Sequence, residues 1–415
     1  MTWLTTLFII AVVAETATRF YLSTRQIAAV TANRDRVPEP FRAEIAIADQ
    51  QKAADYTATR ARLGRLQTLM EAVLTLAFTL GGGIALYDNF WRGTGLNQPW
   101  LGTAVVLSVL GTMMIIGLPF SIYRTFKIEA RFGFNRITPA LFVSDLAKRT
   151  VLGLVLAGPL LLIAITLMEK AGNAWWLWLW GVWTVATIGL SWAYPRFIAP
   201  LFNRFSPLAD EALNARIGAL LTRCGFSSNG VFVMDGSRRS AHGNAYFTGV
   251  GRNKRIVFFD TLMERLGGAE IEAVLAHELG HFRLAHVKQR LVLSMVGSLV
   301  GLAILAWFAQ QPWFYTALGV PTPSTHAALL LFMLVTPAFT YFATPLSAWW
   351  SRKHEFQADD FAIAHADRTA LADALVKLYR DNASTLTPDP VHSAFYDSHP
   401  PALIRIARLR TSAVR

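Results

Sequence analysis

Seven apolar stretches constrain this chain more than any other feature of its sequence. A bilayer core of about 30 Å requires about 20 apolar residues in a helix, because lipid offers no partner to exposed backbone amides and carbonyls. The stretches cover residues 3–21, 69–86, 101–122, 151–167, 175–193, 291–308 and 326–349. The sequence therefore predicts a predominantly α-helical polytopic membrane protein with seven transmembrane helices.

The composition supports this interpretation and excludes other classes of protein. Hydrophobic residues make up 53% of the 415 residues and charged residues only 16%, which excludes intrinsic disorder and is unusual for a soluble enzyme. A single cysteine, Cys224, excludes an internal disulfide framework and a cysteine-rich zinc site. The net charge of +12 comes without a groove-reading motif. We therefore expect contact with the lipid bilayer and no nucleic-acid partner.

Lysine and arginine residues predict the orientation in the membrane. They are dense in the first, third and fifth loops and in the C-terminal tail, and sparse in the second, fourth and sixth loops. By the positive-inside rule, the odd loops and the C-terminus are cytoplasmic and the N-terminus is outside. We interpret the first stretch as a retained helix rather than a signal peptide, because no Lys or Arg precedes it and no clear cleavage site follows.

Two polar stretches, 194–290 and 351–415, lie outside the predicted spans and together offer enough residues for one modest core. The spans between them form an out-and-back hairpin, so both stretches lie on the cytoplasmic face. We predict strands at 230–234, 244–249 and 254–259, a short helix opened by Thr261 and Glu264, helices at 269–286, 351–365, 370–382 and 400–412, and a polar loop at 383–398. The predicted regions are a membrane region (1–200), a first protease part (201–290), a transmembrane hairpin (291–350) and a second protease part (351–415).

The pentad HELGH at residues 277–281 is the strongest chemical signal in the chain. Residues four apart share one face of a helix, so His277 and His281 can both reach one Zn²⁺ at about 2.0–2.1 Å. Glu278 is displaced around the helix, where it can take a proton from a water beside the metal. The flanking apolar stripe consists of Ile271, Val274, Leu275 and Leu279. This stripe indicates a helix packed into a core, which argues against two ordinary surface histidines. We predict one zinc ion per chain.

A catalytic zinc ion takes a third protein ligand and leaves one position for water. The second polar stretch should supply that ligand, and its candidates are His354, Glu355, Asp359, Asp360, His365 and Asp367. Glu355 and Asp359 are again four apart, which fits a ligand with a supporting acid one turn away. His354 points about 100° away from Glu355 around the helix. The alternative is a charged helix end at the membrane surface, which the spacing does not exclude.

Other residues are candidates for contact with a substrate. His399 could stabilise the oxyanion that develops at a carbonyl during hydrolysis, or it could be an ordinary turn residue before a helix. Arg405 could pair with Asp359. Asn244 and Ala245 lie in a strand that could bind a peptide along its edge, because the Asn244 amide offers both a donor and an acceptor. The alternative for this strand is an ordinary interior position.

Six segments together resemble a known family, the CAAX prenyl protease 1 type of M48 zinc metalloproteases. They are 132–136 (FGFNR), 198–208 (IAPLFNRFSPL), 243–249 (GNAYFTG), the HELGH pentad, 351–359 (SRKHEFQAD) and 398–405 (SHPPALIR). These segments occur in the family's order and extend over nearly the whole chain, so the resemblance is specific.

The resemblance implies a zincin-like α+β metalloprotease domain with a small β-sheet. It implies zinc ligands at His277, His281 and Glu355, with Glu278 as general base and acid. It further implies that Asp359 supports the site, that His399 stabilises the tetrahedral intermediate, that Asn244 and Ala245 form the substrate-binding edge, and that the helices surround a large chamber. In eukaryotic relatives the substrate is a prenylated CAAX protein. We expect a peptide or protein substrate, lipidated or membrane-associated, and the arginine-rich, lysine-poor content favours a bacterial inner membrane.

Two other classes of protein fit parts of the pattern. A site-2-type intramembrane metalloprotease also uses H-E-x-x-H, but within a span, whereas this pentad is flanked by Glu270, Glu272, Arg283 and Lys288. A non-catalytic transporter or receptor with structural zinc needs a closed four-ligand site, and the sequence offers three convincing ligands. We therefore predict a membrane-embedded zinc endopeptidase.

Overall fold

The computed structural model describes residues 2–226, 230–248 and 255–411, and most of them are helical. Long helices, with short ones between them, form the first half of the chain and the segment from residue 286 to residue 365. They are α1 (Trp3–Ala32), α2 (Ile47–Phe78), α3 (Gly83–Arg92), α4 (Trp100–Tyr123), α5 (Pro139–Lys170), α6 (Trp175–Ala193), α11 (His286–Ala309), α12 (Pro312–Ala317), α13 (Thr325–Thr340) and α14 (Thr344–His365). A π-helical turn, η2 (Arg124–Glu129), extends α4.

Five or six of the seven predicted membrane spans are matched by long apolar segments in the described part of the chain. Five helical segments in the described part of the chain are long and apolar enough to cross a membrane: α1, α4 with η2, α5, α11, and α13 with α14. The helices α2 and α3, bent by 51° at the break between them, add a sixth if they count as one span. The helix α6 coincides with the predicted fifth stretch but is not among these spans. Its many indole rings are amphipathic and lower its mean hydropathy. Seven spans therefore remain a prediction.

Large apolar side chains cover the outer surface of the long helices. Ile115 on α4, Val155 on α5, Val185 on α6 and Leu346 on α14 are between 62% and 72% exposed. Soluble monomers rarely expose so much contiguous apolar surface. The surface is the kind that a lipid environment would cover.

A smaller mixed part is built from two segments of the chain on either side of α11–α14. Its strands are β1 (Phe205–Pro207), β2 (Val231–Met234), β3 (Ala245–Thr248) and β4 (Arg255–Phe259). Its helices are α7 (Ala199–Phe202), α8 (Glu211–Arg223), α9 (Asp260–Met263), α10 (Gly268–Arg283), α15 (Arg368–Asp381), α16 (Pro390–Tyr396) and α17 (Ala402–Thr411).

The four strands form one sheet in the order β1-β2-β4-β3. β2 and β4 are parallel, whereas β1 pairs antiparallel with β2 and β3 pairs antiparallel with β4. β3 is therefore an edge strand, and no other described strand pairs with its second side. The predicted substrate-binding edge thus lies at a true sheet edge and not in the interior of the sheet.

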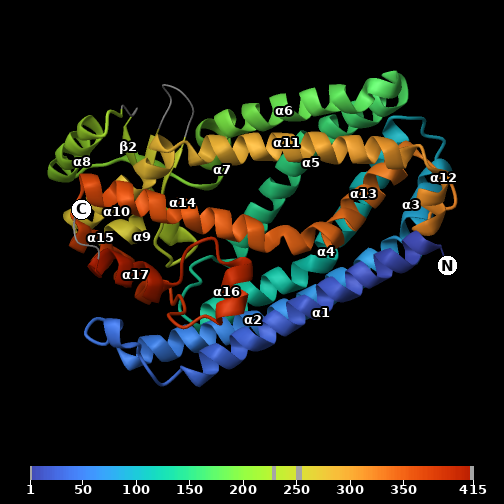
Figure 1. Cartoon of the computed structure of the whole chain (residues 1–415). Helices are drawn as coiled ribbons and strands as arrows, with labels where there is room; N and C mark the ends of the chain where they lie inside the picture. Colours follow the sequence, from blue (N-terminus) through green and yellow to red (C-terminus); the bar gives the residue numbers. More distant parts are fainter. Residues whose placement is uncertain (1, 227–229, 249–254, 412–415) are drawn as a thin grey trace.

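One hydrophobic core joins both segments of the mixed part, which lies at one end of the molecule (Figure 1). Ile217 on α8, Phe258 on β4, Leu275 on α10, Leu371 on α15 and Ile406 on α17 are all buried in it. The predicted apolar stripe of α10 is confirmed, because all four of its members are buried. The C-terminal segment is thereby held against the helix that carries the pentad.

Two element boundaries differ from the prediction. The helix predicted over 269–286 ends at Arg283, because Ala285 adopts a left-handed conformation with φ 58° and separates α10 from α11. The predicted cap at Thr261 is wrong: α9 already begins at Asp260, and the Thr261 hydroxyl donates to the His242 carbonyl instead. Gly249, Lys254 and Ser412, at the ends of predicted elements, lie outside the described residues.

Four elements of the mixed part were not predicted from the sequence. They are β1, α7, α8 and α16, and α16 occupies the segment 383–398 that we interpreted as a polar loop. Asp389 caps α16 by accepting from the backbone amides of Val391 and His392. A seven-residue helix with one apolar turn leaves too weak a periodicity to detect.

Ion pairs attach the mixed part to the long helices. Arg239 donates to both carboxylate oxygens of Asp145 on α5, at 2.7 and 2.9 Å. Arg25 on α1 pairs with Asp389 at 3.0 Å. These contacts fix the sheet and α16 relative to the bundle.

Candidate metal centre

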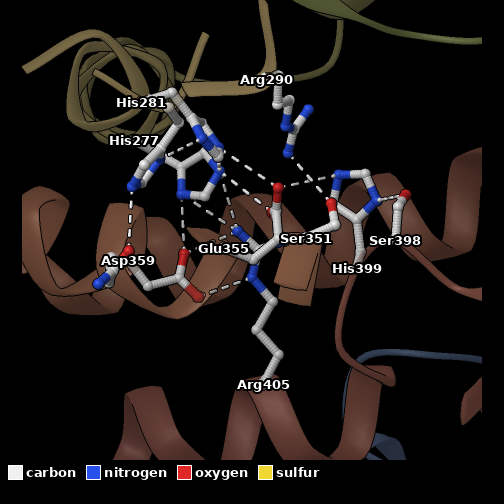
Figure 2. Close-up of polar contacts among 11 residues, drawn as sticks. His277, His281, Arg290, Ser351, Glu355, Asp359, Ser398, His399 and Arg405 are labelled. Atoms are coloured by element: carbon white, nitrogen blue, oxygen red, sulfur yellow. Dashed lines mark hydrogen bonds and ion pairs between the residues drawn. The ribbon is translucent and has the colours of Figure 1, made fainter. Parts of the chain in front are cut away.

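Two helices from distant parts of the chain bring three potential metal ligands together. The helix α10 carries His277 and His281 one turn apart, and α14 carries Glu355 opposite them (Figure 2). The two histidine Nε2 atoms are 3.3 Å apart. Glu355 Oε2 lies 3.4 Å from His277 Nε2, and Glu355 Oε1 lies 3.3 Å from His281 Nε2. The spatial pairing expected from the pentad and the acidic residue of the second segment is therefore present.

The donor spacing fits one tetrahedral zinc ion. At zinc–ligand distances of about 2.0–2.1 Å, two ligands at the tetrahedral angle are about 3.3–3.4 Å apart. Glu355 Oε2 is also buried without a hydrogen-bond partner in the described part of the chain, and a cation would satisfy it. Among the described residues, the group that could hold the ion consists of His277, His281 and Glu355. A group of three leaves a fourth position open, unlike a closed structural site.

The two helices approach closely because residue 280 is a glycine. A Cβ atom at Gly280 would lie 3.0 Å from the Ala358 Cα and 3.1 Å from the Phe361 Cβ. Any side chain at this position would push α10 and α14 apart. The glycine inside the pentad thus sets the distance over which Glu355 reaches the histidines.

Asp359 and Arg405 support the first of the two histidines. Asp359 Oδ1 lies 2.9 Å from His277 Nδ1. The Arg405 guanidinium donates to both Asp359 oxygens, at 2.8 and 2.7 Å, and lies 3.5 Å from Glu355 Oε2. All of these side chains are buried. Burial alone lowers the pKa of Arg405, but the hydrogen bonds to Asp359 raise it above its ordinary value, so the charge persists.

A second series of hydrogen-bond contacts supports His281. Its Nδ1 lies 3.0 Å from His286 Nδ1, and His286 Nε2 lies 3.0 Å from Gln357 Oε1. The Gln357 carbonyl can only accept, so His286 carries its proton on Nε2 and accepts the His281 Nδ1–H. This arrangement leaves His281 Nε2 unprotonated and directed at Glu355. The ring of His354 stacks on His286 with a centroid distance of 3.9 Å, and His354 is therefore not part of the ligand group.

Glu278 follows the first histidine on α10 and is half-buried. Burial raises the pKa of its carboxyl, and the Glu355 carboxylate adds to this effect, whereas the two histidines and Arg405 act in the opposite direction. A carboxyl with a raised pKa is better matched to accepting and returning a proton near neutral pH.

His399 enters the cluster from the segment before α17 (Figure 2). Its Nε2 lies 3.5 Å from Glu355 Oε1, and its Nδ1 lies 3.0 Å from the Ser398 hydroxyl. With the Ser398 hydroxyl donating to Nδ1, the Nε2–H is free to donate toward the centre. The side chain is 63% exposed, so a substrate can reach it.

Asn244 and Ala245 lie apart from this cluster, at the start of edge strand β3. Asn244 is exposed, and its side-chain oxygen accepts from the Ala245 amide at 2.9 Å. β3 packs against α10, the helix that carries the pentad. No contact in the described part of the chain joins Asn244 directly to the three ligands, and the two regions are connected through the packing of β3 against α10.

His286 and Gln357 are the functional candidates that the sequence reasoning missed. His286 follows the pentad by only five residues, but its contact with His281 depends on the turn at Ala285. No helical spacing predicts that contact, because the two residues belong to different helices.

Comparison with known proteins decides the family. One family model, described as CAAX prenyl protease N-terminal with five membrane helices, matches residues 26–204, and the model for peptidase family M48 matches residues 207–413. The CAAX prenyl protease 1 homolog of Dictyostelium discoideum is 33% identical over 393 residues, which cover 92% of this chain and 91% of the relative. The chain belongs to the CAAX prenyl protease 1 type of peptidase family M48.

Further relatives agree with this assignment. CAAX prenyl protease 1 of Saccharomyces cerevisiae is 34% identical and aligns over 73% of this M48 chain and 70% of its own length. The crystal structure of S. mikatae Ste24p has a TM-score of 0.89 and 26% identity, with 99% of both chains covered. This M48 peptidase is therefore a mostly helical integral membrane metalloprotease, and its family implies a bound metal.

Proposed function

We propose that this M48 peptidase is a zinc metalloendopeptidase whose ion is held by His277, His281 and Glu355. The convergence of the two histidine Nε2 atoms and the Glu355 carboxylate, at distances of 3.3, 3.3 and 3.4 Å, carries the proposal. The donors come from two helices separated by a hairpin of long helices, so the convergence is a product of tertiary folding. The α10 helix is outside the spans of the described chain, which disfavours a site-2-type enzyme.

Zinc bound at this site would polarise the scissile carbonyl and lower the pKa of a water toward about 7. Glu278, half-buried beside the ligands, takes the proton of the attacking water and returns it to the leaving nitrogen. The raised pKa of its carboxyl favours this shuttle because burial makes the protonated form less costly than it is for an exposed glutamate.

His399 and the Asp359–Arg405 pair act around the reacting bond. His399 donates from Nε2 to the oxygen that becomes negative in the tetrahedral intermediate. Asp359 accepts from His277 Nδ1 and fixes the ring orientation, and Arg405 holds Asp359 in place.

The substrate is a peptide in extended conformation along the free edge of β3, with Asn244 and Ala245 at its start. The names of the relatives describe proteases of prenylated CAAX sequences. We therefore propose a lipidated or membrane-associated peptide or protein cleaved near a CAAX-type C-terminus, within a chamber formed by the helices.

Seven spans, with α6 as the fifth, complete the proposal for the membrane arrangement. The N-terminus is outside and the C-terminus and protease parts are cytoplasmic, in a bacterial inner membrane. The membrane region (1–200) and the hairpin (291–350) hold the two protease parts (201–290 and 351–415) together.

Substitution of Glu278→Gln tests the function directly. The variant removes the proton acceptor without altering a ligand, so zinc content by mass spectrometry should stay at one per chain while cleavage of a prenylated peptide falls at least 100-fold. The matched control is Glu264→Gln, an exposed carboxylate on the far side of the α9–α10 turn, which should cleave at the wild-type rate. Undiminished cleavage by Glu278→Gln would refute the assigned role, and a wild-type chain without zinc would refute the proposed ion.

A further inference from the structure

Two adjoining cavities lie between the long helices and the sheet. Their volumes are about 430 and 880 Å³, within the range of small-molecule sites. They share the wall formed by Tyr56 and Arg60 of α2, Arg124 of η2, and Ser240 and His242 from the segment before β3. Neither cavity includes the three proposed zinc ligands in its lining.

The larger cavity has an unbalanced positive charge. Arg60 and Arg124 line it, and its lining contains no aspartate or glutamate. Both arginines are exposed to the cavity, and in the described part of the chain neither guanidinium lies within 4.0 Å of a carboxylate. The Arg60 guanidinium instead lies over the Tyr56 ring, 5.2 Å from its centroid. Two unpaired guanidiniums on one wall predict an anionic ligand.

The acidic groups of the smaller cavity are already engaged. Asp145 holds Arg239 through two hydrogen bonds of 2.7 and 2.9 Å. Glu129 accepts from the Tyr56 hydroxyl at 2.8 Å and lies 3.7 Å from His242 Nε2. The Glu129 carboxylate also attracts Arg60, whereas no carboxylate of the described chain forms an ion pair with Arg124, so Arg124 is the stronger candidate on the shared wall for contact with an anion.

The position of the larger cavity relative to β3 indicates which anion it receives. Its lining includes Gly243 and Asn244, directly before the first residue of the edge strand. A peptide added antiparallel to β3, as β4 already is, has its C-terminal end beside Asn244. The last residues of such a peptide therefore point toward Arg60 and Arg124.

We propose that the wall formed by Arg60 and Arg124 binds the free C-terminal α-carboxylate of the peptide substrate. This inference rests on the proposed function, because it takes the β3 edge as the substrate site. A CAAX-type substrate ends three residues after its cysteine. A strand advances about 3.3 Å per residue, so its carboxylate lies about 10 Å beyond the cysteine. The site selects substrates by their chain end as well as by their side chains.

Paired peptides test the proposal. The probes are a farnesylated peptide ending in Cys-Val-Leu-Ser as the free acid and the same peptide as the C-terminal amide, cleaved by the full chain in phosphatidylcholine vesicles. We expect the wild type to prefer the acid about tenfold or more in kcat/KM, because a bidentate arginine–carboxylate contact is lost in the amide. Arg60→Gln and Arg124→Gln should each lower the acid-to-amide ratio several-fold, mainly through KM. Arg124→Lys, which keeps the charge but not the two-donor geometry, should retain only part of the preference.

The control variant is Arg36→Gln, in the exposed loop between α1 and α2, which loses the same charge outside the cavity and should keep the wild-type ratio. Equal cleavage of acid and amide by the wild type would overturn the proposal. So would an unchanged ratio in both glutamine variants. If the arginine variants lose cleavage activity equally on both peptides, and anionic lipid changes the size of that loss, the arginines bind a lipid headgroup instead.

A binding measurement separates this inference from the proposed function. Fluorescence anisotropy with labelled acid and amide peptides on the Glu278→Gln variant reads the carboxylate preference without turnover. Tighter binding of the acid than of the amide, with a preference that Arg124→Gln reduces several-fold, supports the site even if no cleavage is found, which would refute the proposed function alone. Equal binding of both peptides overturns the site whatever the cleavage assay shows.

Discussion

Replacing Asp359 by asparagine removes one charge from the most buried ion pair of the mixed part. Asp359 is 2% exposed and Arg405 4% exposed. The carboxylate accepts two hydrogen bonds from Arg405 at 2.7 and 2.8 Å and lies 2.9 Å from His277 Nδ1. Asparagine keeps the shape and one acceptor oxygen, so the variant isolates the effect of the charge.

The expected effect has two parts. Loss of a carboxylate that orients a metal-binding histidine typically costs 10–100-fold in metal affinity, or about 1.4–2.7 kcal/mol. Leaving the buried Arg405 charge without its partner costs about 3–5 kcal/mol of folding stability. Glu355 Oε2, 3.5 Å from Arg405, offers partial compensation, so we expect the lower end of the stability range.

The assay uses the purified full chain in detergent. Zinc affinity is measured by competition with a chelator, and the unfolding midpoint by intrinsic tryptophan fluorescence. The control is Asp360→Asn, the same substitution one residue later on α14, where the carboxylate forms an exposed pair with Arg408 at 2.7 Å. An exposed ion pair of this kind contributes little to folding stability. If Asp359→Asn matched Asp360→Asn in both measurements, the buried pair would have no role in holding His277.

Three further perturbations follow from the described contacts. His286→Leu should weaken zinc binding about tenfold by freeing His281 Nδ1, whereas His286→Asn, which restores an acceptor, should recover part of it; equal affinities would contradict the assigned contact. Gly280→Ala should separate α10 from α14 and lower both zinc affinity and the unfolding midpoint, while Gly218→Ala on α8, where a Cβ meets open space, should not. Burial raises the pKa of Glu272, but hydrogen bonds from Arg216 and Arg223 outweigh it and lower the pKa below its ordinary value. Its stabilisation is therefore present above about pH 4.3 and lost as pH falls through the lowered pKa. Glu272→Gln should cost about 1 kcal/mol at pH 7, discounted because both arginines are half-exposed, and the difference from wild type in thermal unfolding should shrink below pH 4.

Much of the fold could be predicted from local patterns. The runs of apolar residues predicted the long helices, segments rich in Val, Ile and Phe predicted β2 and β4, and the shorter segment between them predicted β3, all to within a few residues. The short elements β1 and α16 were missed because three to seven residues carry no measurable periodicity. Five or six of the seven predicted spans have a matching segment in the described chain, and tryptophan-rich α6 does not count among them because its mean hydropathy is lower than its length suggests.

The candidate site also has a part that the sequence could predict and a part that it could not. The 3.6-residue period alone placed His277 and His281 on one face and Glu278 beside them. The second segment offered six acidic or histidine candidates, and the spacing reduced them to a preference for Glu355 with Asp359. The stacking of His354 on His286, which excludes it from the ligand group, has no signal in the sequence.

The sequence by itself determined which elements form and which residues within one helix share a face, because both depend on interactions between residues a few positions apart. Only the tertiary structure decided that α14 lies against α10 close enough for Glu355 to meet the two histidines, that β3 is an edge strand, and that Arg60 and Arg124 share a cavity wall with His242. Those arrangements depend on close packing between segments tens to hundreds of residues apart, which is set by the shape of the whole core and not by any local spacing.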